Sequence, residues 1–565
     1  MTRTEYAEHA EFETTRRLLA CLINEGLVEF VLQRLDSSKQ RVLCLRALSH
    51  NSDLSTSSQL VVGLNSNSLV DENGKVCCPI APEQLELPVK LENRKGDTVY
   101  ETNPSKILEK IHEWIPESIP NIPLLETTKQ MLQNSAENQE KWLQFHHQQK
   151  PCDLNSSAIE WERTIIFGHP EHPLHRCLYP ESPSLTGAGN LITPELSFIS
   201  IPDEQLETTG PFTPRLQPLL EKLGLSQSLP GQTIIPCFTS NLPLVLSRLP
   251  RATLVQSFQG IADGQASARS VSIKPQFDYN HHLKMSLPFQ ITGAIRNVKP
   301  WQAYQATYMT ELVERLAHPD LWVNRETATI TGVNMDVQAA RTVCCILRED
   351  LEPRALAEDQ SLIIAAALYH RPAGGAKTYA ETLFGLESQE DKCSWLQKYM
   401  GLLFQLVIPL LGRGIVLETH SQNVLVRVDR RSKSLAGFAI RDMNGVKIHV
   451  PTLQEQGITV DERLAQISET RAASLEALWK RAHRTLIQNH AGFLLRSLGL
   501  DNSQGWSILR GELEKVLFSD ACPMGSELRQ FFWGRNMGYP CFLGAILRGK
   551  PLELEIMQYP NILMR

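Results

Sequence analysis

The sequence predicts an α+β protein built from more than one domain, and three observations lead to this prediction. The chain has 565 residues, too many for one hydrophobic core. Apolar residues recur at helical spacing near both ends, whereas residues 164–298 alternate apolar and polar side chains with the period of half-buried strands. We therefore expect a helical N-terminal domain (1–150), a sheet-rich domain (151–330) and a mostly helical C-terminal domain (331–565).

The first domain is predicted to be a mixed helical domain. Residues 11–35 and 106–114 place apolar side chains three and four apart, which is the spacing of an amphipathic helix. Residues 124–147 are polar with a thin apolar stripe, and this pattern predicts one exposed helix that leads out of the domain. Residues 151–157 then form the joint to the next domain.

In the sheet-rich domain, Leu283, Met285 and Leu287 alternate with polar neighbours, as strand residues do. Beyond about residue 300 helical spacing returns, interrupted by one hairpin whose valines alternate with polar residues. The predicted helices are 302–317, 336–349, 361–369 and 394–411, and the predicted hairpin is 424–441.

Composition excludes several classes of function. Lysine and arginine number 56 against 62 acidic residues, with no long basic block, so we expect neither a nucleic-acid nor an anionic-membrane surface. Residues 1–17 do not read as a secretory signal, and the apolar stretch 400–411 is too short to span a bilayer. The 12 cysteines are scattered, as is typical of reduced thiols, and we expect a cytoplasmic protein.

Oxygen-bearing side chains gather at the base of the predicted hairpin. With a register symmetric about residues 432 and 433, Asn423 and Asp442 face each other, and their oxygens suit Mg²⁺. His420 points toward the same place, and the set resembles the histidine, asparagine and aspartate of kinase-like folds. The alternative is a capped hairpin beside a core histidine.

A second group of candidates indicates a phosphate site. Lys284 emerges on the polar face of its strand, Thr292 can cap a short helix that Pro300 ends, and Arg296 shares its face. Free N–H groups and two partly open cations would attract phosphate oxygens. Ser267 and Arg269 share a face of the preceding strand and add a further contact. The alternative is a solvated strand face followed by a helix cap.

The third group lies in Gly168–Arg176, which we call the histidine loop. Pro170 and Pro173 exclude a regular helix, so the imidazoles of His169, His172 and His175 extend from a rigid loop. Three histidines spaced by three could also bind a metal, because imidazole is a common ligand.

Together, the order and spacing of these three motifs resemble those of the NRPS-independent siderophore synthetases, the IucA/IucC family, over residues 150–550. The resemblance implies a three-domain cupped hand, with a thumb, a sheet-rich fingers domain and a helical palm that bears the kinase-like hairpin. It implies an ATP- and Mg²⁺-dependent ligase that adenylates citrate or a citryl or succinyl derivative. An amine or hydroxyl then displaces AMP, and the family implies a homodimer.

The resemblance also implies a role for each candidate residue. Catalysis, including the orientation of the acid or its adenylate, falls to Arg348, His420 and His172. The nucleotide is held by His169, Arg176, Ser267, Arg269, Lys284, Thr292, Arg296 and Gln422. Mg²⁺ is held by Glu418, Asn423 and Asp442. For Arg348 the structural alternative is an ordinary charge pair with Glu349 at a helix end.

This chain departs from the family after Arg176, where relatives usually carry lysine. Leu178 stands where relatives have a second arginine, and Pro180 stands where they have glycine, while the lysine of their C-terminal stretch has no counterpart in 542–548. Walker A, GxGxxG and GxSxG motifs are absent from the sequence. Two further functions stay open: a kinase-like phosphotransferase that forms ADP, and a non-catalytic nucleotide-binding relative.

Overall fold

The computed structural model describes residues 3–34, 41–48, 59–65, 78–92, 98–115, 122–183, 185, 187–225, 230–266 and 271–565. Helices and sheets are mixed along the whole described chain, so the α+β prediction is confirmed. Short 3-10 turns occur at Pro82–Gln84, His112–Trp114, Asp203–Gln205, Thr239–Asn241, Arg341–Val343, Ala365–Tyr369, Met443–Gly445 and Ile562–Met564.

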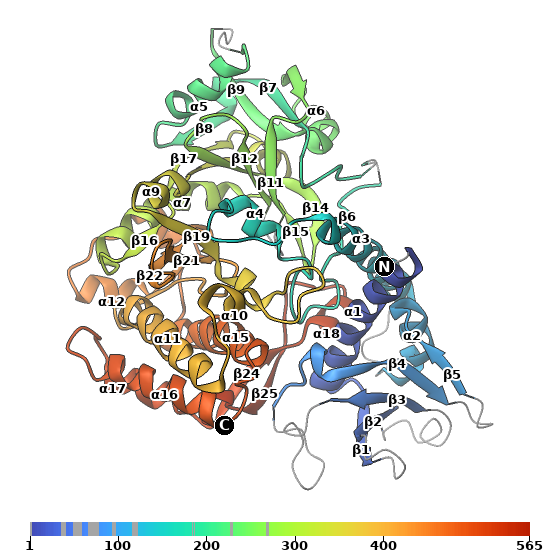
Figure 1. Cartoon of the computed structure of the whole chain (residues 1–565). Helices are drawn as coiled ribbons and strands as arrows, with labels where there is room; N and C mark the ends of the chain where they lie inside the picture. The colour runs from blue at the N-terminus through green and yellow to red at the C-terminus, as the bar shows by residue number, and fades with distance from the viewer. Residues whose placement is uncertain are drawn as a thin grey trace.

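The N-terminal region contains a sheet that sequence reasoning missed. Its strands run in the order β1-β2-β3-β4-β5, each antiparallel to its neighbour, and lie beside the helices in the blue part of Figure 1. The elements are α1 (Arg3–Asn24), β1 (Glu29–Arg34), β2 (Arg41–Arg46), β3 (Gln59–Leu64), β4 (Leu85–Glu92), β5 (Thr98–Glu101), α2 (Pro104–Ile111) and α3 (Ile122–Gln148).

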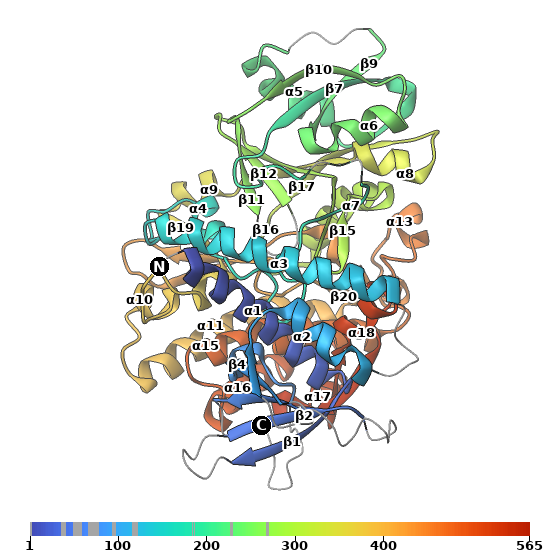
Figure 2. The same cartoon turned by 90° about the vertical axis from the view of Figure 1, so that its right-hand side faces the viewer.

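Helix α3 was predicted to be exposed, and the structure corrects this. It packs along α1 and α2, and Figure 2 shows it crossing in front of the molecule above both. Leu132, Ser135 and Gln139 are fully buried on its inner face. The polar residues of this helix therefore include an interface that hydrophobic periodicity alone could not reveal.

The middle region holds the sheet that positions the site. Its strand order is β11-β12-β13-β18-β17-β8, and two smaller sheets have the orders β10-β7-β9 and β15-β14-β6. The elements are α4 (Ala158–Arg163), β6 (Tyr179–Pro180), β7 (Leu196–Pro202), β8 (Leu206–Thr209), α5 (Phe212–Lys222), β9 (Gln232–Phe238), α6 (Leu242–Arg248), β10 (Thr253–Phe258), β11 (Ala262–Ala266), β12 (Val271–Pro275), β13 (His281–Met285), β14 (Leu287–Ile291), β15 (Ala294–Arg296), α7 (Pro300–Leu316), β16 (Leu321–Val323), β17 (Glu326–Gly332), α8 (Val337–Ala340) and β18 (Cys345–Glu349).

Two predicted helices are wrong. Residues 336–349 contain the short α8 and a 3-10 turn before strand β18, and residues 361–369 are mostly strand and 3-10 turn. Residues Cys345–Arg348 of β18 are buried between two partner strands, so they lack the alternation that identifies a half-exposed strand. Buried strands of this kind cannot be told from buried helix by periodicity.

The C-terminal region is mostly helical around a sheet of order β16-β22-β21-β19. Its elements are α9 (Glu352–Ala357), β19 (Gln360–Ile364), α10 (Tyr379–Phe384), α11 (Gln389–Gly412), β20 (Ile415–Val416), β21 (Val424–Asp429), β22 (Leu435–Ile440), β23 (Lys447–Ile448), α12 (Val450–Glu455), α13 (Glu462–Gln466), α14 (Leu475–Ala482), a π-helix (His483–Ala491), α15 (Gly492–Ser497), α16 (Ser503–Leu517), α17 (Gly525–Phe532), β24 (Asn536–Pro540), α18 (Phe542–Leu547) and β25 (Ile556–Pro560).

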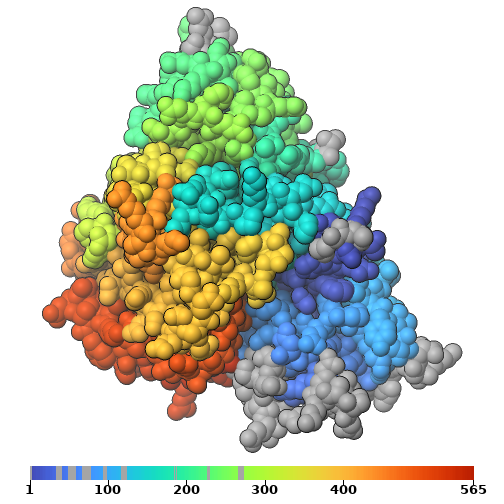
Figure 3. Space-filling view, viewed as in Figure 1, coloured from blue at the N-terminus to red at the C-terminus, as the bar shows by residue number. Residues whose placement is uncertain are grey.

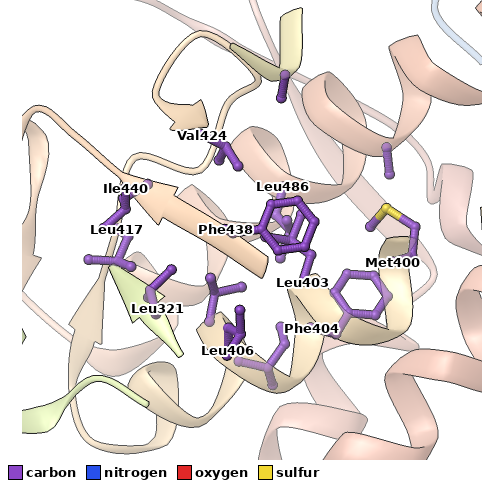
Figure 4. Packing of buried hydrophobic residues seen from close by; sticks show 14 of the residues in the cluster. Leu321, Met400, Leu403, Phe404, Leu406, Leu417, Val424, Phe438, Ile440 and Leu486 are labelled. Carbon is purple, nitrogen blue, oxygen red and sulfur yellow. The ribbon is translucent and has the colours of Figure 1, made fainter. Parts of the chain in front are cut away.

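The predicted helices 302–317 and 394–411 are confirmed as α7 and α11. Ser388 begins α11 with a capping box to Asp391, which satisfies N–H groups that the first turn leaves open. One face of α11 packs on the hairpin, where Met400, Phe404 and Phe438 meet in a tight core (Figure 4). The same core includes Val424 and Ile440, the strand pair at the base of the hairpin.

The predicted hairpin is confirmed as β21 and β22, but its register differs from the prediction by one residue. Val424 pairs with Ile440, and the Arg441 N–H donates to the Asn423 carbonyl. Asp442 therefore lies one residue beyond the position opposite Asn423. The pairing shifts within the hairpin, between Arg427 and Val428, an irregularity that symmetry about the turn could not anticipate.

The regions pack into one body, as the space-filling view shows (Figure 3). Helix α18 from the C-terminal part lies beside α1 from the N-terminal part (Figure 1). Among the described residues, no helix combines the length and the apolar character that crossing a membrane requires.

Candidate active site

Four charged side chains meet where the middle sheet touches the hairpin base. The Glu326 carboxylate lies 2.8 Å from the Arg348 guanidinium and 3.6 Å from Lys284 Nζ. Asp442 pairs with the same two cations, bonding to Lys284 and lying 3.6 Å from Arg348. The pairing of β13, β18 and β17 brings Lys284, Arg348 and Glu326 together. We call these four residues the ion cluster.

Asp442 occupies a special backbone position. Its φ of 71° lies in the left-handed region, where a non-glycine residue is strained, so its placement is maintained by the surrounding structure. Burial raises the pKa of the Asp442 carboxyl, but Lys284 and Arg348 outweigh it and hold the pKa well below its usual range. Asp442 is therefore a carboxylate at neutral pH.

Glu326 is the member of the ion cluster that sequence reasoning missed. Its side chain is fully buried and bonds to Arg348, for which the alternative to a site role was a pair with Glu349 at a helix end. The sequence signal is a single acid at the start of the run Glu326–Gly332, which otherwise reads as an ordinary strand. A buried glutamate needs a cation, and this requirement could have pointed to Lys284 or Arg348.

The second half of the site lies on the loop before β21. His420 Nε2 is 3.4 Å from the Glu418 carboxylate and 3.3 Å from the Asn423 amide nitrogen, so these three side chains lie together. Glu418 also pairs with Arg481. The imidazole therefore connects the amide at the hairpin base to the carboxylate of Glu418.

Gln422 faces a supporting network. Its carbonyl accepts two hydrogen bonds from the Arg441 guanidinium, at 3.0 and 2.7 Å, and Arg441 also pairs with the buried Glu162 of α4. These contacts attach the loop before β21 to the middle region. The two bonds from Arg441 thus fix the main chain at Gln422.

Thr292 does not cap a helix, which corrects the sequence prediction. Thr292 and Gly293 form the turn between β14 and β15, with Thr292 at a φ of 58°, and Pro300 begins α7 instead of ending a helix. The Arg296 guanidinium binds the Thr292 hydroxyl and the Ile291 carbonyl across this turn. The turn was missed because tight turns usually place glycine or asparagine at positive φ.

The histidine loop is held largely by its own main chain. His169 Nδ1 accepts N–H bonds from Glu171 and His172, and His172 Nδ1 accepts from Leu174. The rings are therefore fixed in orientation with their Nε2 atoms turned away from the loop backbone. These bonds do not suit three histidines converging on one metal, and no metal-binding group of three acidic, cysteine or histidine side chains occurs in the described part of the chain.

Arg176 lies behind the loop. Its guanidinium donates to the carbonyls of Ile165 and Ile166 and stacks over Trp142, 4.3 Å from the ring centre. Burial lowers the pKa of Arg176 to about 9. These contacts give Arg176 a scaffold role in this structure, in addition to any it has toward phosphate.

Two of the motifs predicted from sequence meet directly. A β-carbon placed on Gly293 would lie 3.3 Å from His172 Nε2, so the histidine loop faces the β14–β15 turn. On its other side His172 packs against Phe542, with ring centres 5.0 Å apart, and Arg484 lies over Phe542 at 5.6 Å. His172 thus connects the phosphate-type turn to the C-terminal helices.

A cavity of about 790 Å³ lies in the C-terminal region. Its lining includes the acids Glu418 and Glu476, the cations Lys480, Arg481 and Arg484, several amides and Phe531. Lys480 pairs with Glu476, and Arg481 pairs with Glu418. Arg484, Gln488 and Asn489 enter it from the π-helix, a rare helix type that occurs often at functional sites. The sequence did not predict that residues of this π-helix line a cavity, because the segment carries no recognised motif.

Four further positions add less. Ser267 and Arg269 lie outside the described residues. Leu178 is half-buried and lines a separate cavity of about 570 Å³ with Trp142 and Arg176, rather than the cavity beside Glu418. His175 does not supply the charge that Leu178 lacks, because it is fully buried and that burial holds its pKa below the ordinary value, so it is neutral at pH 7.

Comparison with known families supports the resemblance. The sequence profile described as the IucA / IucC family matches residues 253–370, which include the ion-cluster residues Lys284, Glu326 and Arg348. A profile described as ferric iron reductase FhuF-like transporter matches residues 393–543, which include the hairpin and the π-helix.

Individual relatives extend the match to the whole chain. The NRPS-independent siderophore synthetase-like protein ankE of Aspergillus thermomutatus is 36% identical over 568 residues, covering 96% of this chain and 91% of the relative. The NRPS-independent siderophore synthetase rfs of Rhizopus delemar is 30% identical over 388 residues, covering 65% of this chain and 61% of the relative.

The fold matches as well. ATP-bound aerobactin synthetase IucA from Klebsiella pneumoniae superposes with a TM-score of 0.74 over 98% of this chain and 99% of that one, at 14% identity. With the near full-length match to the Aspergillus relative, these findings show that the chain belongs to the family of NRPS-independent siderophore synthetases.

Proposed function

We propose that this protein is an ATP-dependent siderophore synthetase that adenylates a carboxylic acid and then joins it to an amine or a hydroxyl. The acid is citrate or a citryl or succinyl derivative, and the products include AMP and pyrophosphate. One observation carries the proposal: Glu418 lines the same cavity as Lys480, Arg481 and Arg484, and it also contacts His420 beside the ion cluster. A pocket for an anionic acid therefore adjoins groups suited to a nucleotide.

In the first step a carboxylate oxygen of the acid attacks the α-phosphorus of ATP, and pyrophosphate leaves. Lys284, Arg296 and His172 supply positive charge and N–H donors for the phosphates, which is the stabilisation that such a transfer needs. The nucleophile then attacks the acyl carbon, and AMP leaves. Arg348 and His420 orient the acid and its adenylate, so that the protein contributes positioning and no covalent nucleophile.

Mg²⁺ fits the oxygen donors at the hairpin base. Asp442 is ionised and Asn423 offers an amide oxygen, with Glu418 close by through His420. Magnesium sites often combine one or two carboxylates with substrate phosphates, so a preformed cluster of three acids is not required. Bound there, the ion would neutralise phosphate charge.

The family resemblance further suggests that the three regions act as thumb, fingers and palm of a cupped hand, and that the protein works as a homodimer. The scattered cysteines favour a reducing compartment, so we place the protein in the cytoplasm. Its partners are small molecules, namely the acid and the amine or hydroxyl.

A product assay tests this function. The protein is incubated with ATP and Mg²⁺ across a panel of acids, including citrate and succinyl derivatives, crossed with polyamines and hydroxamates. We expect acid-dependent release of pyrophosphate and AMP in equal amounts, resolved by nucleotide chromatography. Formation of ADP would replace the proposal with phosphotransfer, and binding of ATP without turnover by any acid would indicate a non-catalytic relative.

A further inference from the structure

Helix α1 lies outside the segments that carry the site motifs, yet one face of it contacts the histidine loop. Thr14 Oγ1 is 3.1 Å from His175 Nε2, and Arg17 Nε donates to the His169 carbonyl at 3.1 Å. One turn further, the Cys21 thiol lies 3.6 Å from the Glu171 carbonyl. These three residues are three and four apart, so they occupy one stripe of the helix.

The contact between Thr14 and His175 has a defined direction. His175 is fully buried and its pKa is lowered, first by burial and then by Arg17, so the ring is neutral and carries one N–H. His175 Nδ1 lies 2.6 Å from the Phe167 carbonyl, which can only accept, so the proton resides on Nδ1. Nε2 is then an acceptor, and the single proton of the Thr14 hydroxyl is shared between Nε2 and the Ala10 carbonyl, each 3.1 Å from Oγ1.

Arg17 is held firmly at its own end. Its guanidinium donates to the carbonyl of Glu13 at 2.6 Å and to its carboxylate at 2.8 Å. Burial raises the pKa of Glu13, but Arg17 and Arg16 outweigh this and lower it, so the carboxylate stays charged. The bond from Arg17 to His169 therefore fixes one carbonyl of the loop to a rigid helix.

The Thr14–His175 and Arg17–His169 contacts lie on the two sides of His172, whose ring faces the β14–β15 turn. His169 and His175 lie on either side of His172, and the His172 ring is oriented by the loop's own N–H groups. Any displacement of the loop backbone therefore moves His172 Nε2 relative to Gly293, which it closely approaches.

We propose that α1 is the positioning element of the histidine loop, with Thr14 and Arg17 as the positioning residues that hold its backbone and thereby orient His172. The use of His172 at the nucleotide phosphates rests on the proposed function. The mechanical coupling between α1 and the loop does not.

Two adjacent threonines provide a matched test. Thr14 and Thr15 are both fully buried on α1, but Thr15 Oγ1 donates to the Thr102 carbonyl, away from the loop. Thr14→Val and Thr15→Val each remove one buried hydroxyl and keep the side-chain shape, and Thr14→Ser restores the hydroxyl. The full-length variants are compared by thermal melting, by hydrogen exchange of the segment 168–176, and by ATP kinetics.

Thr14→Val should speed exchange in 168–176 about fivefold and raise the KM for ATP by a similar factor with little change in kcat, since one hydrogen bond has about this effect. Thr15→Val should lower the melting temperature to a similar extent with neither change. Thr14→Ser should recover both.

Equal loop exchange in both valine variants, or unchanged exchange in Thr14→Val, would overturn the positioning role. Faster exchange in Thr14→Val alone with an unchanged KM for ATP would support the coupling and instead count against His172 as a phosphate contact, which belongs to the proposed function.

Discussion

The ion cluster and the histidine loop hold their polar groups in opposite ways. In the ion cluster, two cations and two carboxylates from distant segments neutralise one another. In the histidine loop, the ring nitrogens and Arg176 bind mostly main-chain groups. The cations of the ion cluster can therefore exchange a carboxylate for phosphate, and its carboxylates can exchange a cation for Mg²⁺. The rings of the histidine loop, in contrast, are already fixed in orientation.

The strongest test of this contrast is Glu326→Gln. The change removes the fully buried carboxylate that Arg348 and Lys284 share, and breaking such a buried pair costs roughly 3–5 kcal/mol. We expect a loss of this order in the free energy of unfolding, measured by urea titration, together with loss of pyrophosphate release. Glu314→Gln, at the more exposed pair with Arg325, is the control and should cost under about 1 kcal/mol.

If Glu326→Gln were as mild as its control, the cluster would not depend on its buried carboxylate. Lys284 was expected to be a partly open cation, but it is buried and pairs with both Glu326 and Asp442.

The next largest effect is expected for Asp442→Asn, which tests exchange of partners directly. The neutral amide keeps the shape of the side chain but binds Mg²⁺ more weakly. Loss of a charged contact costs about 1.5 kcal/mol, so the Mg²⁺ concentration for half-maximal activity should rise about tenfold. Titration of pyrophosphate release with Mg²⁺ measures this. Asp429→Asn, in the exposed turn of the same hairpin, should leave the Mg²⁺ requirement unchanged. An identical Mg²⁺ curve for both variants would move the metal elsewhere.

Acid should destabilise the histidine loop at a higher pH than the ion cluster. The pKa of His175 in the folded protein lies below its unfolded value near 6.5, so its contribution to stability is lost as pH falls from about 6.5 toward the folded pKa. The folded pKa of Asp442 lies below an unfolded value near 4, so its contribution persists until pH falls below about 4.

Hydrogen exchange at pH 7.5, 5.5 and 3.5, corrected for the intrinsic pH dependence of amide exchange, measures this order. We expect residues 168–176 to lose protection before residues 420–442. Simultaneous loss in both segments would mean that global unfolding, rather than local titration, governs the acid response.

The smallest effect is expected at Leu178. Because its side chain is half-buried at the edge of the 570 Å³ cavity, Leu178→Arg can reach solvent there without disrupting the core. That cavity is separate from the one beside Glu418, and an exposed charge away from the ligand contributes little, so the KM for citrate should stay within about twofold of its natural value. Steady-state kinetics with citrate and with an amidated citrate measure the change. A clear fall in the KM for citrate on substitution would instead place position 178 at the acid site.

Local patterns predicted some parts of the fold well and others poorly. The hairpin at 424–441 and helix α11 were predicted, because alternation and helical spacing are written in consecutive residues. Strand β18 was mistaken for helix because its buried residues show no alternation. The ion cluster was only partly predicted, since Glu326 joins it through strand pairing that no short window of sequence contains.

The site loops show the same limit. Thr292 was expected to start a helix, because a threonine before a polar run is typical of a helix cap, whereas the chain turns back at once. The cations of the π-helix were not identified, since their role depends on a cavity formed by tertiary packing.

The meeting of α1 and α18 has a consequence for the order in which the protein folds. Glu25, just after α1, accepts N–H bonds from Leu543 and Gly544 at 2.8 and 2.7 Å, across more than 500 residues of chain. Contacts of such sequence separation form late, because their loop-closure entropy is lost before they are made. During synthesis, the His172–Phe542 contact cannot form until α18 has left the ribosome. Nascent chains that still lack α18 therefore hold an incomplete nucleotide site, and ATP should not stabilise them.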